Sequence, residues 1–235
     1  MSSPSTSPKV RDLRIGEYLA FARRHPEQFE RTDGIRILLD PADIAAVEDQ
    51  VAADLRRRGL PEAGAEVGIL AADPWLYIIR DAVEFPDGGR RGYLRVINRT
   101  GHGCAVLCVL DGRIMLTRQF RHALRRWSPE IPRGAIELGQ TPDDTAVAEV
   151  REEMGGEIES MVPMGFVHGS TNLYYNGAHL YFAKLKSVGA PQLSEAIVAI
   201  ERPTVAEFER MLTVGEITDS FTVSAFCHAR LRGLI

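Results

Sequence analysis

The chain has 235 residues, 45% of them hydrophobic, which is enough for one sizeable domain with an extension. A formal net charge of −4 argues against binding nucleic acid through bulk electrostatics, and the longest apolar run, 104–110, is too short to span a bilayer. The three cysteines lack the spacing of a disulfide framework, and the N-terminal segment has no apolar core like that of a signal peptide. We therefore expect a cytoplasmic protein that binds neither nucleic acid nor a membrane.

The first seventy residues are predicted to be mainly helical. In chain order, apolar spacing and breaker residues predict a disordered polar tail over 1–13, a helix over 15–25, a short strand over 34–40, a second helix over 41–58 and a linker over 61–68. Asp40 is suited to cap the second helix because Pro41 follows it, and Gly59 marks its end. After the tail, these elements form a helical N-terminal extension over 14–70.

From residue 71 the pattern is that of a domain with both strands and helices. Strands are predicted over 75–85, 91–98, 103–110, 113–120, 160–168 and 179–185, and helices over 204–212 and 219–232. Asp111-Gly112 is the strongest local signal, because this dipeptide favours the tight turn of a hairpin. Cys104 and Cys108 share one face of a strand, where buried packing is favoured over a zinc pair. This order of elements predicts an α+β sandwich over 71–235.

Three glutamates cluster near the end of a further predicted helix. Thr141 and Pro142 provide its cap and first turn, and Glu149, Glu152 and Glu153 follow at helical spacing. Stacked like charges on a helix repel by roughly 0.2–0.5 kcal/mol per pair, and the nearby arginine at position 151 points to another side. A divalent cation such as Mg²⁺, which prefers carboxylate oxygens, would relieve this repulsion. The alternative is a solvated acidic helix face.

Residues 134–156 resemble the Nudix hydrolase signature, G-x5-E-x7-R-E-U-x-E-E-x-G-U, in which U is aliphatic. The matching positions are Gly134, Glu149, Val150, Glu152, Glu153 and Gly155. Three positions depart from the signature: Gln140 replaces the loop glutamate, Ala148 replaces the helix arginine, and Gly156 replaces an aliphatic residue. The preceding segment, with RQFR at 118–121 and EIPRG at 130–134, is similar to the ADP-ribose pyrophosphatase branch, and the similarity covers roughly residues 75–233.

The resemblance implies a Nudix-type α/β/α sandwich with a mixed sheet, in addition to the helical N-terminal extension. It implies a metal-dependent hydrolase that cleaves the pyrophosphate of a nucleoside diphosphate linked to another group, of the ADP-ribose or nucleotide-sugar type, and releases a nucleoside monophosphate. Mg²⁺ or Mn²⁺ would be the cofactor and a nucleotide-type small molecule the substrate. Because members of this branch commonly complete a partner's site with N-terminal strands, we expect a homodimer in which residues 74–97 have that role.

The resemblance also implies roles for individual residues. The metal would be held by Glu149, Glu153, Glu152 and the backbone carbonyl of Arg133. Catalytic roles would belong to Glu152 and to Glu195, with Glu201 as the second choice for the latter. Phosphate or ribose would be held by Arg121 and Arg126, and a base would stack on Trp75 or Tyr77. Structural alternatives stay open. They are a surface charge for Glu195, a salt bridge from Arg121 to Glu130, and core packing for the aromatic rings.

The two altered positions of the signature affect support for the metal ligands. Gln140 and Ala148 remove both members of a charge pair, so neither change leaves a stranded charge. Because the three glutamates are retained, we predict a hydrolase whose activity is reduced or differently tuned. Two other functions stay open: a catalytically weak or inactive Nudix-fold module that binds or senses a ligand, and a scaffold whose N-terminal helices bind a partner.

Overall fold

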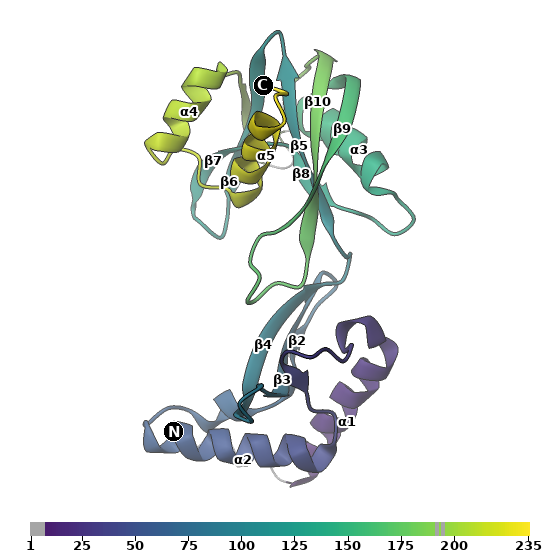
Figure 1. Ribbon diagram of the computed structural model, residues 1–235, viewed down its shortest axis with the longest axis vertical. Coiled ribbons are helices and arrows are strands. Elements are labelled where there is room, and N and C mark those ends of the chain that lie inside the picture. Colours follow the sequence, from purple (N-terminus) through teal and green to yellow (C-terminus); the bar gives the residue numbers. More distant parts are fainter. Residues whose placement is uncertain (1–7, 191–192, 194–195) are drawn as a thin grey trace. The chain divides into compact units, whose positions relative to one another are not determined.

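The computed structural model describes residues 8–190, 193 and 196–235, and the chain divides into two compact units, Met1–Arg99 and Thr100–Ile235. Figure 1 labels most of the helices and strands of both units. The first unit is built around one hydrophobic cluster and the second around two. Each unit therefore has the core that an independently packed domain requires.

The first unit packs helices on a small antiparallel sheet. Its elements are α1 (Pro8–Arg24), the 3₁₀ helices η1 (Pro26–Gln28) and η2 (Glu62–Ala65), α2 (Pro41–Arg57), and the strands β1 (Arg36–Ile37), β2 (Gly68–Ala72), β3 (Leu76–Glu84) and β4 (Arg90–Asn98). β3 is central, because β1, β2 and β4 all pair with it in antiparallel register. The Asp40 side chain accepts hydrogen bonds from the first N–H groups of α2, which confirms the predicted cap.

Helix α1 begins earlier than the sequence indicated, so residues 8–13 are helical where a polar tail was expected. Arg11 and Arg14 explain the difference. Both form ion pairs with Glu48 on α2, at 3.1 Å and 2.6 Å. Because Glu48 lies far along the chain, local composition gave no sign of this anchoring.

The strands that follow residue 68 share a core with these helices. Tyr18 of α1, Ile44 of α2 and Ile79 of β3 are fully buried in one cluster. The Tyr18 hydroxyl also donates to the Asp81 carboxylate of β3 at 2.6 Å. We expected a helical extension that ends at residue 70, whereas the compact unit continues to Arg99 because β3 carries the apolar residues on which both helices pack.

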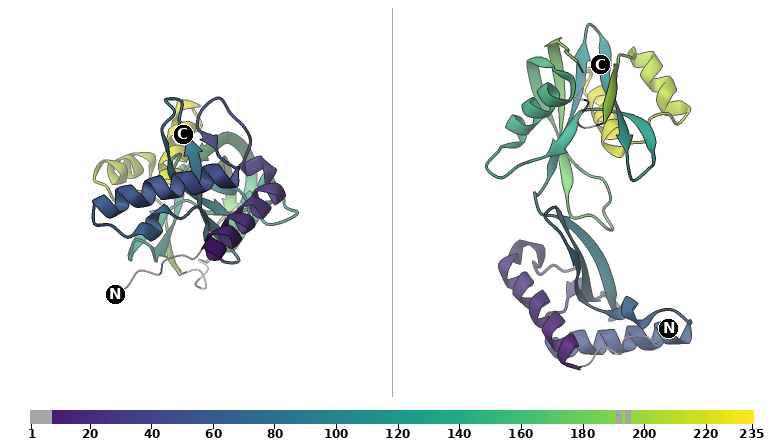
Figure 2. Two further views of the ribbon diagram at one scale, coloured as in Figure 1. Left: turned by 90° about the horizontal axis from the view of Figure 1, so that it is seen from below. Right: turned by 180° about the vertical axis from the view of Figure 1, so that it is seen from behind.

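The second unit is a mixed sheet with helices on both faces (Figure 1, Figure 2). Its elements are β5 (Gly103–Leu110), β6 (Arg113–Arg121), β7 (Arg126–Glu130), β8 (Arg133–Ala135), α3 (Pro142–Met154), β9 (Glu157–His168), β10 (Gly177–Ser187), β11 (Ile197–Glu201), α4 (Val205–Thr213) and α5 (Ser220–Leu231). The strand order is β11-β6-β5-β10-β9, with β7 paired to β6 and β8 paired to β5. β5 and β10 run parallel and the other pairs are antiparallel, so the predicted mixed sheet is confirmed.

Alternate side chains of β5 separate the two cores of this unit. Cys104, Val106 and Cys108 point to the face that α3 covers, where they pack with the apolar side chains of that helix. Ala105 and Leu107 point to the opposite face and pack in the cluster that includes α4 and α5. A strand that is buried on both faces needs a layer on each side. The α/β/α sandwich is therefore confirmed.

Several local predictions for this unit are also confirmed. Asp111 and Gly112 form the β5–β6 turn with φ angles of 50° and 74°, as the tight hairpin turn requires. Cys104 and Cys108 are buried on one face, in agreement with packing as their role. Among the described residues, none of the helices combines the length and the apolar character needed to cross a membrane.

Candidate active site

Helix α3 carries the three glutamates, and local chemistry fixes both of its ends. The Thr141 hydroxyl accepts from the Asp144 N–H while the Asp144 carboxylate accepts from the Thr141 N–H, which is a capping box. Gly155 ends the helix in the left-handed conformation, with φ of 58°, which glycine adopts without strain. The buried face of the helix includes Glu153 beside the apolar Val150. One of the three carboxylates therefore points inward with the core residues.

The Glu149 carboxylate lies directly against Gly134 of β8. A Cβ atom built on Gly134 would lie 1.8 Å from Oε1 of Glu149, so only glycine leaves room for the carboxylate at this place. Gly103 of β5 is also closely packed, because its Cβ would lie 2.6 Å from the Gly134 carbonyl oxygen. The two glycines thus allow the helix carboxylate, the loop backbone and the sheet to approach one another.

Glu153 lies one helical turn after Glu149 and is 2% exposed. Both carboxylates affect the buried thiols of β5. Burial is the main cause that raises the pKa of Cys104 to about 12, and the charges of Glu149 and Glu153 raise it further. Burial and the Glu153 charge also raise the pKa of Cys108. Glu149 and Glu153 of α3 both act on the thiols of β5, so this pair supplies the negative charge and the carboxylate oxygens that Mg²⁺ prefers.

The backbone beside Gly134 orients a further oxygen. In the antiparallel pairing of β8 with β5, Gly134 lies opposite Cys104, and the Val106 N–H donates to the Pro132 carbonyl. Bonds to an antiparallel neighbour are made by alternate residues, so the Arg133 carbonyl points away from β5. The carbonyl that the sequence assigned to the metal is therefore outside the β5–β8 ladder.

Glu152 differs from the other two glutamates, because it is exposed on the outer side of α3, 3.9 Å from the Arg151 guanidinium. Within 8–190, 193 and 196–235, no three His, Cys, Asp or Glu side chains are arranged to hold one metal ion. The residues nevertheless fit Mg²⁺, which keeps several waters and binds through one or two carboxylates together with substrate phosphate. Glu149, Glu153 and the Arg133 carbonyl are the groups that would hold it.

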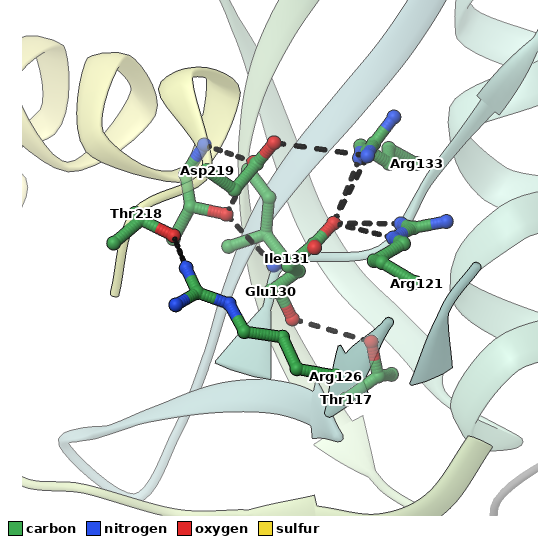
Figure 3. A network of polar contacts seen from close by, with 9 residues as sticks. Thr117, Arg121, Arg126, Glu130, Ile131, Arg133, Thr218 and Asp219 are labelled. Carbon is green, nitrogen blue, oxygen red and sulfur yellow. Dashed lines mark hydrogen bonds and ion pairs between the residues drawn. The ribbon is translucent and has the colours of Figure 1, made fainter. Parts of the chain in front are cut away.

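A buried carboxylate organises the basic residues next to β8. Glu130, at the end of β7, is 2% exposed, and its Oε2 accepts from Arg121 Nη2 at 2.6 Å and from Arg133 Nη2 at 3.0 Å (Figure 3). Arg133 also lies 3.7 Å from Asp219, the N-cap of α5. The salt bridge from Arg121 to Glu130, which the sequence left open, is thus present. Arg133 is a second cation that pairs with the same Glu130 carboxylate.

The same network fixes the loop through α5 (Figure 3). The Thr222 hydroxyl accepts from the Ile131 N–H at 3.2 Å, and the Asp219 carboxylate accepts from the Thr222 N–H at 2.8 Å. Arg126, which was assigned to substrate, donates to the Thr218 hydroxyl at 2.7 Å. The sequence did not indicate that the start of α5 supports the site; its only signal was an aspartate placed to cap a predicted helix.

Replacing Glu130 with glutamine is expected to lower the free energy of unfolding by about 2–4 kcal/mol, because two arginines lose a shared buried carboxylate. Burial opposes ionisation of Glu130, but the bonds and charges of Arg121 and Arg133 hold its pKa below the usual range. A lowered folded-state pKa gives stability that is complete above the unfolded value of about 4.3 and is lost as the pH falls through the folded value. Denaturant unfolding at neutral pH and at about pH 3 measures both effects.

Glu201→Gln is the matched control for Glu130→Gln. Glu201 of β11 pairs with Arg118 at 2.6 Å, but this pair is exposed. Exposed pairs contribute about 0–1 kcal/mol, so the control should change little. A loss of stability in Glu130→Gln no larger than in Glu201→Gln, or a loss that persists unchanged at acid pH, would contradict a stabilising role of the Glu130 charge.

The remaining predicted site residues lie in different parts of the chain. Trp75 precedes β3 and is 69% exposed. Tyr77 of β3 packs edge-to-face on Phe21 of α1, with ring centroids 4.8 Å apart, so its core-packing alternative is observed. Both belong to the first unit. Glu195 lies outside the described residues, and the stacking and catalytic roles of these residues stay predictions.

The two altered signature positions are accommodated without a charged partner. The Gln140 side-chain oxygen accepts from the Thr145 hydroxyl at 2.8 Å, so Gln140 helps to hold the start of α3. Ala148 is a small, half-buried side chain on that helix. Because neither position carries a charge, the pair leaves no buried charge to neutralise.

A family model described as the NUDIX domain matches residues 99–222, which is more than half of the chain. The chain belongs to the Nudix family. The match spans β8, α3 and the start of α5, and so contains Gly134, Glu149, Glu153, Glu130 and Asp219. The residues assembled above are therefore those of the Nudix domain itself.

Individual relatives agree with this assignment. The chain is 29% identical over 161 residues to the ADP-ribose pyrophosphatase of Bacillus subtilis (strain 168), covering 67% of this chain and 85% of the relative. It is 30% identical over 155 residues to the methanol dehydrogenase activator of Bacillus methanolicus, covering 65% of this chain and 83% of the relative. A crystal structure of an ADP compounds hydrolase has a TM-score of 0.62 and 19% identity, covering 71% of this chain and 91% of that one, and it supports the fold.

These matches confirm the predicted family, branch and enzyme class. The chain is a Nudix hydrolase of the ADP-ribose pyrophosphatase-like branch. The sequence found the branch through RQFR and EIPRG, and the structure explains why these segments occur together: Arg121 of the first is ion-paired with Glu130 of the second.

Proposed function

We propose that this Nudix hydrolase cleaves the pyrophosphate of a nucleoside diphosphate linked to another group, of the ADP-ribose or nucleotide-sugar type, and releases a nucleoside monophosphate with Mg²⁺ or Mn²⁺ as cofactor. The observation that carries the proposal is the carboxylate pair of Glu149 and Glu153, one of which lies against Gly134. The name of the Bacillus subtilis relative supports ADP-ribose as the first substrate to test.

The bound cation would neutralise charge on the pyrophosphate and polarise the attacking water. Glu149, Glu153 and the Arg133 carbonyl would hold the cation. Glu152, on the outer side of α3, would add a ligand or orient the attacking water. Glu195 is the second candidate for this catalytic role. Because the carboxylates of Glu149 and Glu153 are fixed by packing, the cation, the attacking water and the pyrophosphate would meet with little reorganisation of the protein.

Substrate binding would use arginine and aromatic side chains. Arg121 bonds Glu130 through Nε and Nη2, so Nη1 is the nitrogen that it would offer to phosphate or ribose. Arg126 would act beside it on the β6–β7 hairpin. Trp75 or Tyr77 would stack on the base. The proposal includes a cytoplasmic homodimer in which residues 74–97, in β3 and β4, complete the site of the partner.

The experiment that tests the proposal is incubation of the purified chain with Mg²⁺ and a panel of ADP-ribose, nucleotide sugars and dinucleotides, with products separated by chromatography. Release of a nucleoside monophosphate that stops on chelation and resumes with Mg²⁺ or Mn²⁺ is the expected result. Thermal stabilisation by one of these ligands without any product would overturn the proposal and favour the ligand-sensing alternative.

A further inference from the structure

Three histidines gather at one end of the mixed sheet of the second unit. Together with two aromatic residues they form what we call the imidazole cluster: His102, Phe166, His168, Tyr175 and His179. Phe166 is its centre, because the rings of His102, His168 and His179 lie edge-to-face around it, with centroids 4.8, 5.0 and 5.0 Å away. His102 also stacks on Tyr175 at 5.8 Å. None of these residues has a part in the hydrolysis proposed above.

The imidazole cluster lies on the same face and in the same row of the sheet as the glutamate pair. Gly134 of β8 pairs with Cys104 of β5, Cys104 pairs with His179 of β10, and His179 pairs with Phe166 of β9. Directly paired residues point to the same face, and Cys104 points to the face of α3. Glu149 lies over the Gly134 end of this row. Two strand spacings, about 10 Å, separate His179 from Gly134.

The cluster is open to solvent. Phe166 and Tyr175 are 37% and 36% exposed, and His168 is exposed at the end of β9. Three histidines could also suggest a transition-metal site. No group of three His, Cys, Asp or Glu in the described parts of the chain has that arrangement, so a metal is not what the cluster is built to hold.

The electrostatics of the cluster favour an anion. Burial lowers the pKa of His102, and the charges of His179 and His168 lower it further. Besides the imidazoles and the Tyr175 phenol, the titratable groups along this face are Cys104, Cys108, Tyr181, Glu149 and Glu153, and the Tyr181 hydroxyl donates to the Asp143 carboxylate at 2.5 Å. An anion beside the cluster would offset these unfavourable charge interactions of His102 and could accept from an imidazole N–H group.

One imidazole is held in a donor orientation. The Gly177 N–H donates to His102 Nδ1 at 3.3 Å, so the Nε2 atom of the neutral ring carries the proton. The Asn176 amide donates to the Gly101 carbonyl at 2.7 Å and fixes the same turn. The ring of Phe166 covers Gly177, whose Cβ would lie 2.5 Å from Phe166 Cζ. The cluster is thus positioned by packing on glycine before any ligand arrives.

We propose that the imidazole cluster binds a phosphomonoester that the substrate carries in addition to its diphosphate. This inference rests on the proposed function, because a diphosphate at Glu149 and Glu153 sets the distance at which a second phosphate reaches His179. The backbone separation of about 10 Å between Gly134 and His179 is the span over which the group between the two phosphates would have to extend. The substrate class then narrows to nucleoside diphosphate derivatives with a phosphorylated sugar.

The test compares the binding of adenosine 2′,5′-bisphosphate, adenosine 3′,5′-bisphosphate and AMP by calorimetry without metal. At least one bisphosphate is expected to bind roughly tenfold more tightly than AMP, because the second phosphate adds a charge-assisted hydrogen bond. In the double variant His168→Gln/His179→Gln, this preference for a bisphosphate over AMP should disappear.

His122→Gln is the matched control, because this imidazole is exposed on the turn after β6 and lies outside the cluster. His168→Gln alone, at an exposed position, serves if the double variant does not fold. Equal binding of AMP and both bisphosphates by the wild-type chain, or a preference unchanged by the histidine substitutions, would overturn the proposal. The chain could prefer a bisphosphate through these histidines and still hydrolyse no substrate. That result would support the phosphomonoester site and would contradict the proposed hydrolysis.

Discussion

Glu153→Gln is expected to lower the Mg²⁺-dependent kcat by at least about 100-fold, equivalent to about 2.7 kcal/mol of barrier. Glu153 is 2% exposed on the inner face of α3, and the proposal makes its carboxylate one of the two main ligands of the cation. Glutamine keeps the shape of the side chain but removes its charge. The measurement is single-turnover and steady-state hydrolysis of the substrate that the panel identifies, over a range of Mg²⁺ concentrations.

The control for Glu153→Gln is Glu159→Gln, the same change at an exposed position of β9. Thermal unfolding without metal shows whether either variant is destabilised. We expect Glu153→Gln to fold at least as well as wild type in the absence of metal, because it removes one of two repelling carboxylates. Activity within about threefold of wild type, at saturating Mg²⁺, would exclude Glu153 as a main metal ligand.

Gly134→Ala is expected to raise the Mg²⁺ concentration that gives half-maximal hydrolysis by roughly 10- to 100-fold. The fold is expected to stay intact. The new Cβ would lie 1.8 Å from the Glu149 Oε1 atom, so the carboxylate must move. The φ of Gly134 is not in the left-handed region, so alanine itself meets no backbone strain there. The carboxylate is the end of a flexible side chain, and the cost therefore falls on its position instead of on stability.

Gly16→Ala is the matched control for this change, because a Cβ at Gly16 in α1 meets nothing within 4 Å. Mg²⁺ titrations of the hydrolysis rate and thermal unfolding, with and without Mg²⁺, distinguish the two variants. If Gly134→Ala loses stability but keeps the wild-type Mg²⁺ dependence, the contact of Glu149 with Gly134 serves packing and not metal binding.

Other contacts take the place of the charge pair that the signature lacks at Gln140 and Ala148. Gln140 is occupied by a bond to Thr145 at the start of α3, and the loop of β7 and β8 is held by Glu130 and Asp219 instead. Ion pairs that lie outside the signature helix therefore hold Arg133, the residue before the Gly134 position on which the Glu149 carboxylate lies. This arrangement agrees with a hydrolase that keeps its ligands after losing the usual supporting charge pair.

The sequence by itself determined the elements whose signals are local. Thr141 and Gly155 bound α3, Asp40 caps α2, and Asp111-Gly112 turns the β5–β6 hairpin, because caps and tight turns depend on residues only a few positions apart. The glutamate spacing and the glycine loop were enough for the family, since they lie within one short segment.

The tertiary structure alone decided what depends on distant partners. The early start of α1 follows from ion pairs with Glu48, and the membership of β2–β4 in the first unit follows from a shared core. Likewise, Arg121 is held by Glu130, and the imidazole cluster forms because β9, β10 and the residues before β5 meet side by side. Such contacts are selected by packing and pairing across the fold, and they have no period or spacing that a sequence can display.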